Sequence, residues 1–330
     1  MIKGRIVGTG STTPKRILTN KDLETIVDTS DEWITRRTGI KERRISSGNL
    51  SESTSDLATK ASLRALEMGG ISSETLDMIV IGTVTPDRQF PSVACFVQKA
   101  LKASKAVAFD VSAGCSGFLY GLSVADNAIA TGSCQNALVI GAERLSSITN
   151  WEDRSTCVLI GDGAGAVVLT PGTADDGILS THLQSDGSFW NLLYSSDGIS
   201  KIPEILNTIE GKPFYMIMDG NRLFKKAVSC LTDIAGAALE HQNLSSADIT
   251  LMVPHQANLR IIKAVAEKLS IPMDRVYTNI QKYGNTSSAT VPIALDEANR
   301  EGLIKAGDYV LLVTFGAGLT WGASVVKWSF

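Results

Sequence analysis

The sequence predicts an α/β protein made of two similar halves. Short apolar runs that suit buried strands alternate with segments of helical periodicity, which is typical of parallel sheets with crossover helices. In addition, residues 65–83, ALEMGGISSETLDMIVIGT, align without gaps with residues 238–256, ALEHQNLSSADITLMVPHQ. We therefore expect two copies of a β-loop-α-β unit, over residues 1–171 and 172–330, with largely parallel sheets covered on both faces.

The repeat extends beyond this alignment and brings three polar residues into related places. GAGAVVL (163–169) resembles WGASVVKW (321–328), and a slip of three residues puts Cys115 opposite Asn285. His255 follows an apolar strand of the second copy. Because a duplication brings equivalent strand ends toward one interface, we expect Cys115, His255 and Asn285 to converge there.

The first third of the chain supplies the early elements of the first copy. Residues 2–8 suit a strand, and the following GTGSTTP suits a loop that lacks the third glycine of a dinucleotide motif. Residues 29–44 are polar and basic, so we expect a surface excursion. Residues 53–69 have helical spacing, with Leu57, Ala61, Ala65 and Met68 on one side, and a turn and a strand follow.

The segment from Ala106 to Gly132 combines a strand, a sharp turn and a helix around Cys115. An apolar run is followed by SAGCSG, whose small residues permit a tight turn and close approach of other groups. Phe118, Leu122, Ala125 and Ile129 then share a helical face. A helix N-terminus favours a thiolate, so Cys115 is a candidate nucleophile. The alternative is that it is a small buried hydrophobe, as many free cysteines are.

Composition excludes several classes of function. The 330 residues carry a net charge of −3, which gives no global attraction for nucleic acid or a membrane surface. The five cysteines form no CxxC pair and no metal-ligand spacing with the three histidines, so we expect neither disulfides nor a metal. No signal peptide or membrane span is apparent. These features predict a soluble cytoplasmic protein.

A thiol, an imidazole and a carboxamide together suit acyl transfer. Cys115 can hold an acyl group as a thioester, while His255 and Asn285 can donate hydrogen bonds to an enolate oxygen. Backbone N–H groups of the turn 315–318 could form an oxyanion hole with that of Cys115. Taken singly, His255 could be structural, and Asn285 could be a turn residue or a helix cap.

Several motifs, quoted in chain order, resemble one known family over essentially the whole chain. They are SDEWI, RTGI, DVSAGCSGF, IGDGAGA, VPHQANLRI, YGNTSSA and FGAGLTWGA, and they resemble β-ketoacyl-[acyl-carrier-protein] synthase III. The resemblance implies a thiolase-like fold with layers in the order α-β-α-β-α. It also implies that acetyl-CoA loads Cys115 and that His255 and Asn285 promote decarboxylation of malonyl-acyl carrier protein. The product would be a 3-oxoacyl-carrier protein that initiates fatty-acid synthesis, with coenzyme A as part of a substrate and no cofactor.

The resemblance also implies a binding site for coenzyme A. Trp33 and Arg154 are similar to the pair that sandwiches the adenine, and Arg37 to the residue that meets the phosphates. Gly220 and Asn258 resemble residues that line the pantetheine tunnel.

The remaining assignments concern partner proteins. Phe90 resembles the residue that closes the acyl pocket across a homodimer interface, and Arg260 and Lys225 resemble a docking site for the acidic carrier protein. Lys263, one helical turn from Arg260, would extend this patch, whereas Glu267 stands where the family suggests a lysine.

A second departure from the family pattern is at Ala317, and other functions remain open. Ala317 interrupts a glycine triplet, but its N–H can serve the oxyanion hole unless its φ must be positive. The chain could also be a related synthase of secondary metabolism, or one resembling hydroxymethylglutaryl-CoA synthase. A catalytically silent partner subunit is a third possibility, against which the retention of Cys115, His255 and Asn285 argues.

Overall fold

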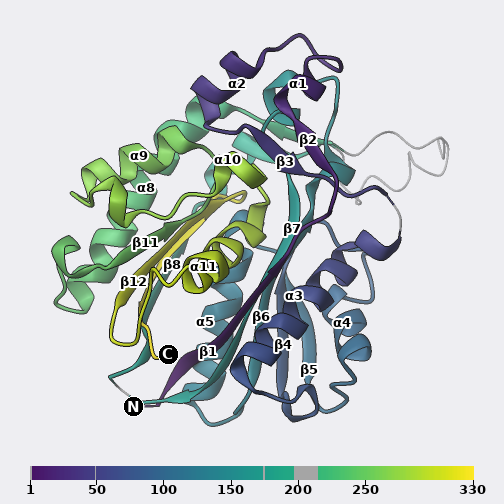
Figure 1. Ribbon diagram of the computed structural model, residues 1–330. Coiled ribbons are helices and arrows are strands. Elements are labelled where there is room, and N and C mark those ends of the chain that lie inside the picture. Colours follow the sequence, from purple (N-terminus) through teal and green to yellow (C-terminus); the bar gives the residue numbers. More distant parts are fainter. Residues whose placement is uncertain (1, 49, 174, 197–214) are drawn as a thin grey trace.

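The computed structural model describes residues 2–48, 50–173, 175–196 and 215–330, and their backbone forms two main sheets (Figure 1). The first sheet has five strands in the order β1-β7-β6-β4-β5. Their bounds are Lys3–Thr12 (β1), Asp162–Gly172 (β7), Ala137–Arg144 (β6), Met78–Gly82 (β4) and Val107–Val111 (β5).

The second sheet has four strands in the order β11-β12-β13-β8. Their bounds are Leu251–Pro254 (β11), Tyr309–Gly316 (β12), Thr320–Lys327 (β13) and Gly177–Ser185 (β8). Two small hairpin-like pairs flank the sheets: β2 (Ile17–Thr19) with β3 (Glu42–Arg44), and β9 (Leu193–Ser195) with β10 (Met216–Met218).

Helices form three layers around these sheets, as the thiolase-like resemblance predicts (Figure 1). α3 (Thr54–Gly69) and α4 (Val93–Leu101) cover the outer face of the first sheet. α5 (Gly117–Ala130) and α11 (Thr290–Arg300) fill the space between the sheets, and α8 (Gly220–His241) and α9 (Leu259–Lys268) cover the outer face of the second. Four short helices complete the described chain: α1 (Asn20–Leu23), α2 (Asp31–Thr38), α6 (Arg154–Cys157) and α10 (Ile280–Tyr283).

The two sheets have corresponding strand orders. In each, a parallel neighbour (β4 beside β6, β11 beside β12) is followed by an antiparallel strand (β7, β13) and then by β1 or β8. The partner of β4 on its other side is β5, whereas β11 has only a single parallel bridge there, from Met252 to Val276. All strands of the first sheet lie within residues 3–172, and those of the second lie within 177–327.

The expectation of largely parallel sheets is wrong for the strand pairs. In the two main sheets of the described chain, four of the seven neighbouring pairs are antiparallel. The reason is that β7 and β13 return directly beside the preceding strand of their sheets, without a long crossover helix.

Local sequence explains the helix boundaries. α3 begins after Ser53, whose hydroxyl accepts from the Asp56 amide, and ends at Gly70 in the left-handed conformation, which confirms the expected helix. The polar stretch 29–44 contains more regular structure than a surface excursion. Ser30 caps α2, and Ile34 packs this helix into a small core, so that Trp33 is held in place.

Candidate active site

A cavity of about 870 Å³ opens between the two halves of the chain, and Cys115, His255 and Asn285 all line it. Cys115 lies in a short 3₁₀ turn, Gly114–Ser116, after β5, and His255 directly follows β11. Asn285 precedes a second such turn, Ser287–Ala289, which leads into α11. The structure therefore brings together the three residues that the sequence repeat led us to expect in one place.

Glycines allow the backbone to approach Cys115 closely. A Cβ on Gly316, at the end of β12, would lie only 2.4 Å from the Cys115 backbone nitrogen. Gly114 has a φ of +56°, and a Cβ there would lie 2.6 Å from the Ala317 nitrogen. The Thr314 hydroxyl donates to the Cys115 carbonyl at 3.0 Å. The turns at 114–116 and 315–318 are thus in direct backbone contact.

This contact suits the predicted oxyanion hole. Ala317 lines the same cavity as Cys115, and its φ lies outside the left-handed region. An alanine at this position therefore causes no backbone strain, and its N–H is retained. The departure from a glycine triplet leaves the required donor in place.

The pKa of the Cys115 thiol is higher than its place before a helix suggested. Burial raises its pKa to about 12, although a hydrogen bond from the Ser287 side chain lowers it in part. The position before a helix suggested a lowered pKa, whereas burial acts in the opposite direction and raises it. The resting residue is a neutral thiol that must lose its proton when it attacks.

His255 is buried and neutral. Its backbone N–H donates to the Val313 carbonyl at 2.8 Å, and its Nδ1 lies 2.6 Å from the Thr290 Oγ1. Burial lowers the His255 pKa to about 3, so the imidazole carries one N–H at neutral pH. The Thr290 hydroxyl also lies 2.9 Å from the Ser287 carbonyl, which it can reach as a donor. Because a hydroxyl has a single proton, its direction decides which His255 nitrogen is protonated.

Asn285 is fixed by hydrogen bonds to its backbone and to its side-chain oxygen. Its N–H donates to the Leu159 carbonyl at 2.7 Å, and its carbonyl accepts from Gly161 at 2.9 Å. Its Oδ1 accepts from the Ser287 N–H at 2.8 Å. The amide oxygen is thereby occupied, which leaves the NH₂ group as the donor available toward a ligand in the cavity.

Sequence reasoning missed Glu143, a fully buried carboxylate at the end of β6. It accepts hydrogen bonds from the loop after β4 and from Ser287 and Ser288 beside Asn285. The signal was present in the motif IGAE, where a lone acid ends an otherwise apolar strand. Its partners are distant in the sequence, so only the fold shows what it binds.

The residues predicted to bind coenzyme A fall into two groups. Gly220 and Asn258 line the cavity, at the first turn of α8 and the N-cap of α9. Trp33, by contrast, does not line the cavity, and the guanidinium groups of Arg37 and Arg154 lie 5.0 and 4.8 Å from its ring centroid. The two arginines and the tryptophan therefore form one cluster, from α2 and α6.

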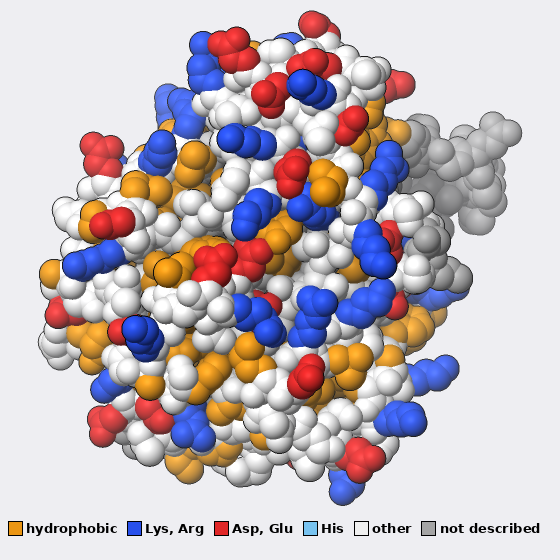
Figure 2. All heavy atoms as spheres, in the orientation of Figure 1, with side chains coloured by type: hydrophobic (Ala, Val, Ile, Leu, Met, Phe, Trp, Pro, Cys, Tyr) orange, Lys and Arg blue, Asp and Glu red, His pale blue; other side chains and the backbone are white. Residues whose placement is uncertain are grey.

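The residues assigned to partner proteins are exposed. Phe90 is 84% exposed and does not line the cavity of its own chain. Arg260 and Lys263 on α9 and Lys225 on α8 are exposed too, and Arg260 lies 5.3 Å from the ring of Phe224, which lines the cavity. Figure 2 shows basic side chains, interspersed with acidic ones, over the region of α2 and α9.

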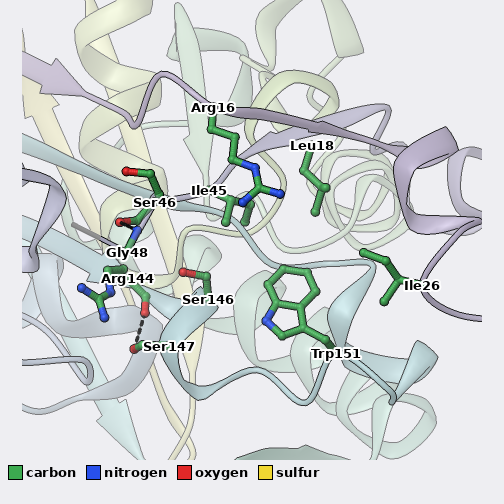
Figure 3. A pocket seen from close by; sticks show the side chains of 11 residues that line it. Arg16, Leu18, Ile26, Ile45, Ser46, Gly48, Arg144, Ser146, Ser147 and Trp151 are labelled. Carbon is green, nitrogen blue, oxygen red and sulfur yellow. Dashed lines mark hydrogen bonds between the residues drawn. The ribbon is translucent and has the colours of Figure 1, made fainter.

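Figure 3 shows a second, smaller cavity of about 380 Å³. Arg16, Trp151 and several serines line it, and it contains none of the predicted site residues. The 3₁₀ turn Leu145–Ile148 separates the two cavities: Leu145 and Ile148 line the larger one, whereas the serines between them line the smaller one.

No described residues form a metal site or a membrane span. The described ranges contain no group of three or more His, Cys, Asp or Glu side chains placed to hold a metal ion. None of the helices in those ranges is both long enough and apolar enough to cross a bilayer.

Comparison with known proteins agrees with this geometry. The family model of 3-oxoacyl-[acyl-carrier-protein] synthase III matches residues 109–187, and the model of its C-terminal part matches residues 239–328. The β-ketoacyl-[acyl-carrier-protein] synthase III of Caldanaerobacter subterraneus subsp. tengcongensis is 54% identical over 328 residues, which cover 99% of this chain and 98% of the relative.

Solved structures give the same result. The crystal structure of 3-oxoacyl-[acyl-carrier-protein] synthase III from Aquifex aeolicus is similar with a TM-score of 0.92 and 49% identity, over 98% of this chain and 100% of that one. The priming β-ketosynthase of the R1128 polyketide pathway has a TM-score of 0.93 but only 34% identity, over 99% and 96% of the two chains. Because the identity to the synthases is high over the full length, and Cys115, His255 and Asn285 share one cavity, this chain belongs to the β-ketoacyl-[acyl-carrier-protein] synthase III family of condensing acyltransferases.

Proposed function

We propose that Cys115 is the acyl-accepting nucleophile of this enzyme, that His255 and Asn285 drive decarboxylation, and that acetyl-CoA and malonyl-acyl carrier protein are the substrates. The observation that carries this assignment is the convergence of the three side chains on one cavity. The cavity is large enough for a thioester arm and is lined mainly by apolar residues, with a few polar groups near Cys115.

In the first half-reaction, the Cys115 sulfur attacks the thioester carbonyl of acetyl-CoA. The new C–S bond forms, the bond from carbon to the coenzyme A sulfur breaks, and the thiol proton passes to the departing coenzyme A thiolate. His255, one of the titratable groups that line the cavity, can relay this proton. The Cys115 and Ala317 N–H groups stabilise the tetrahedral oxyanion.

In the second half-reaction, the malonyl thioester occupies the cavity emptied by coenzyme A. Its C–CO₂ bond breaks, CO₂ leaves, and the electron pair passes into an enolate. The Asn285 NH₂ group and an N–H on His255 Nε2 donate to the enolate oxygen. This role requires the Thr290 hydroxyl to donate to Nδ1, which places the single imidazole proton on Nε2.

The enolate carbon then attacks the acetyl group on Cys115. A C–C bond forms, the C–S bond breaks, and the 3-oxoacyl-carrier protein is released. The departing Cys115 sulfur takes up one proton, because burial keeps its pKa far above neutrality. The Cys115 thiolate therefore returns to the thiol form after every turnover.

Binding of coenzyme A involves the Trp33 cluster. Adenine stacked between Trp33 and Arg154 needs a spacing of about 7 Å, or two van der Waals contacts of roughly 3.5 Å each. The guanidinium now lies at 4.8 Å from the ring, and it donates to the Asp28 carbonyl at 2.7 Å. We therefore propose that the nucleotide separates this pair on binding, while Arg37 meets its phosphates.

Carrier protein and partner subunit meet different surfaces in this proposal. Arg260, Lys225 and Lys263 receive the acidic carrier protein beside the cavity mouth, where Arg260 contacts Phe224. A second copy of the chain binds along β5, an edge strand of the first sheet, where Val107 is 60% exposed. Phe90 of each chain then reaches the acyl pocket of the other.

Incubation with a panel of acyl-CoAs, followed by intact-mass spectrometry, tests the assignment. We expect the wild-type chain to gain one acetyl group and Cys115→Ala to gain none. Cys95→Ala is the matched control, since Cys95 is also a free thiol but does not line the cavity. Acetylation of the Cys115→Ala variant at the wild-type rate would remove Cys115 from the mechanism.

A further inference from the structure

Glu143 is a buried acid to which the proposed reaction gives no role. It is fully buried and makes no ion pair with any described residue. A buried carboxylate without a counter-charge is costly unless hydrogen-bond donors surround it. Packing alone does not explain this arrangement, because burial of an amide or an apolar side chain would cost less desolvation free energy.

One side of the Glu143 carboxylate holds the loop after β4. Its Oε2 accepts from the Thr85 N–H at 3.1 Å and from the Thr83 and Thr85 hydroxyls. Both oxygens also lie 3.1 Å from the Val84 nitrogen. Thr83 and Val84 line the catalytic cavity, so this carboxylate fixes part of its wall.

The other side of the carboxylate holds the turn that follows Asn285. Its Oε1 accepts from the Ser287 hydroxyl at 3.0 Å and from the Ser288 hydroxyl at 3.2 Å. Ser287 is a non-glycine residue with a φ of +51°, a conformation that persists only when its surroundings enforce it. Its N–H is the group that orients the Asn285 side chain, and its hydroxyl is within hydrogen-bonding reach of Cys115.

We propose that Glu143 is a positioning residue whose ionised carboxylate clamps the loop 83–85 to the turn 287–288, and thereby sets the orientation of Asn285 and the Ser287 hydroxyl for condensation. The backbone N–H groups of Val84 and Thr85 and the hydroxyls of Thr83, Thr85 and Ser287 can all donate to the ionised carboxylate. The Ser288 hydroxyl has a single proton and also lies 2.6 Å from the Gly82 carbonyl. A protonated carboxyl has its own proton to place, so it cannot accept from all of these donors. This inference rests on the proposed function of Cys115 and Asn285.

The geometry makes Glu143→Gln informative. The backbone N–H groups of Val84 and Thr85 cannot turn, so the glutamine oxygen must face them and its NH₂ must face Ser287 and Ser288. The Ser287 hydroxyl must then rotate away from residue 143. The cavity keeps its volume, but the orientation of Ser287 is lost.

Protonation of wild-type Glu143 has a similar effect. Burial raises its pKa to about 7, in spite of the hydrogen bonds that lower it. As the pH falls through this value, the carboxyl gains a proton and can no longer accept from every donor. The titratable group whose charge interacts with that of Glu143 is Cys115, and Arg144 is its neighbour on β6.

The test compares wild type with Glu143→Gln in two assays over pH 5.5–9. The first measures kcat and KM for condensation, and the second measures alkylation of Cys115 by iodoacetamide, read by mass spectrometry. For Glu143→Gln we expect kcat at pH 8 to fall at least about tenfold, with KM for acetyl-CoA changed less than about twofold, and the acidic limb near pH 7 to disappear. Alkylation should become several-fold faster, because the negative charge of Glu143 opposes the thiolate.

Asp162→Asn is the matched control. Asp162 is also a fully buried carboxylate, held by the Ser46 N–H and by the N–H and hydroxyl of Ser146. These two serines line the smaller cavity, as Figure 3 shows. Asp162→Asn should keep the wild-type pH profile and alkylation rate. Equal effects of both substitutions, or an unchanged acidic limb in Glu143→Gln, would overturn the proposal. Alkylation needs no substrate. A wild-type protein that is alkylated but never acetylated would therefore count against the proposed function. The comparison of alkylation rates between wild type and Glu143→Gln would still test the role of Glu143.

Discussion

Gly316→Ala is the most direct test of the close backbone approach at Cys115. The added Cβ would lie 2.4 Å from the Cys115 nitrogen and 3.0 Å from the Ser116 nitrogen, whereas ordinary contacts begin at 3.4 Å. Neither side can yield easily, because Gly316 is paired with Thr320 in the second sheet and Thr314 holds the Cys115 carbonyl. The two backbones must therefore separate by about 1 Å.

This separation has a calculable consequence. A misplacement of about 1 Å at a catalytic group costs on the order of 10² in rate. Overpacking of a tight contact also costs about 1–3 kcal/mol of the free energy of unfolding. We therefore expect both acetylation of Cys115 and overall kcat to fall about a hundredfold, because the Cys115 N–H and the Ala317 N–H move together.

The measurements are the acetylation rate by intact mass, kcat for condensation and the thermal midpoint of unfolding. Gly236→Ala is the control: Gly236 lies within α8, and a Cβ there meets no atom within 4 Å. It should keep full activity and gain up to about 1 kcal/mol, since alanine favours a helix. Wild-type acetylation and stability in Gly316→Ala would refute the argument that these backbones are in contact.

Two further predictions concern the roles assigned to single side chains. Thr290→Val removes the hydroxyl that can donate to His255 Nδ1, so malonyl decarboxylation should slow at least about tenfold while acetylation of Cys115 persists. Thr290→Ser should restore the rate. A fully active valine variant would exclude control of the His255 tautomer by Thr290. Arg260→Glu should raise KM for the carrier protein several-fold and leave acetyl-CoA loading nearly unchanged. Arg275→Glu is the control, because Arg275 is exposed and does not line the cavity. An equal loss with the carrier protein and with acetyl-CoA would contradict the role of Arg260 in carrier docking.

Much of the site could be predicted from the sequence because the repeat is encoded locally. Equivalent strands and turns recur at a nearly constant spacing, so the places of Cys115, His255 and Asn285 follow from topology alone. The strand directions could not be predicted in the same way, since periodicity within β7 or β13 does not tell which neighbour the strand will join.

The protonation states of the site residues could not be predicted from the sequence either. The helix that follows Cys115 suggested a thiolate, but the pKa depends on how many atoms from distant segments exclude water around the sulfur. Glu143 shows the same dependence. Its six donor groups come from segments about 60 and 145 residues away along the chain, and the residues near the IGAE motif do not predict them.

The sequence by itself determined the family, the internal repeat and the three side chains that we propose for acyl transfer, because residue type and spacing are local properties. Only the tertiary structure decided that Cys115 rests as a thiol, that Ala317 can stand within the glycine turn, and that Glu143 joins the two walls of the cavity. Solvation and hydrogen bonding depend on which distant segments meet, and folding alone brings them together.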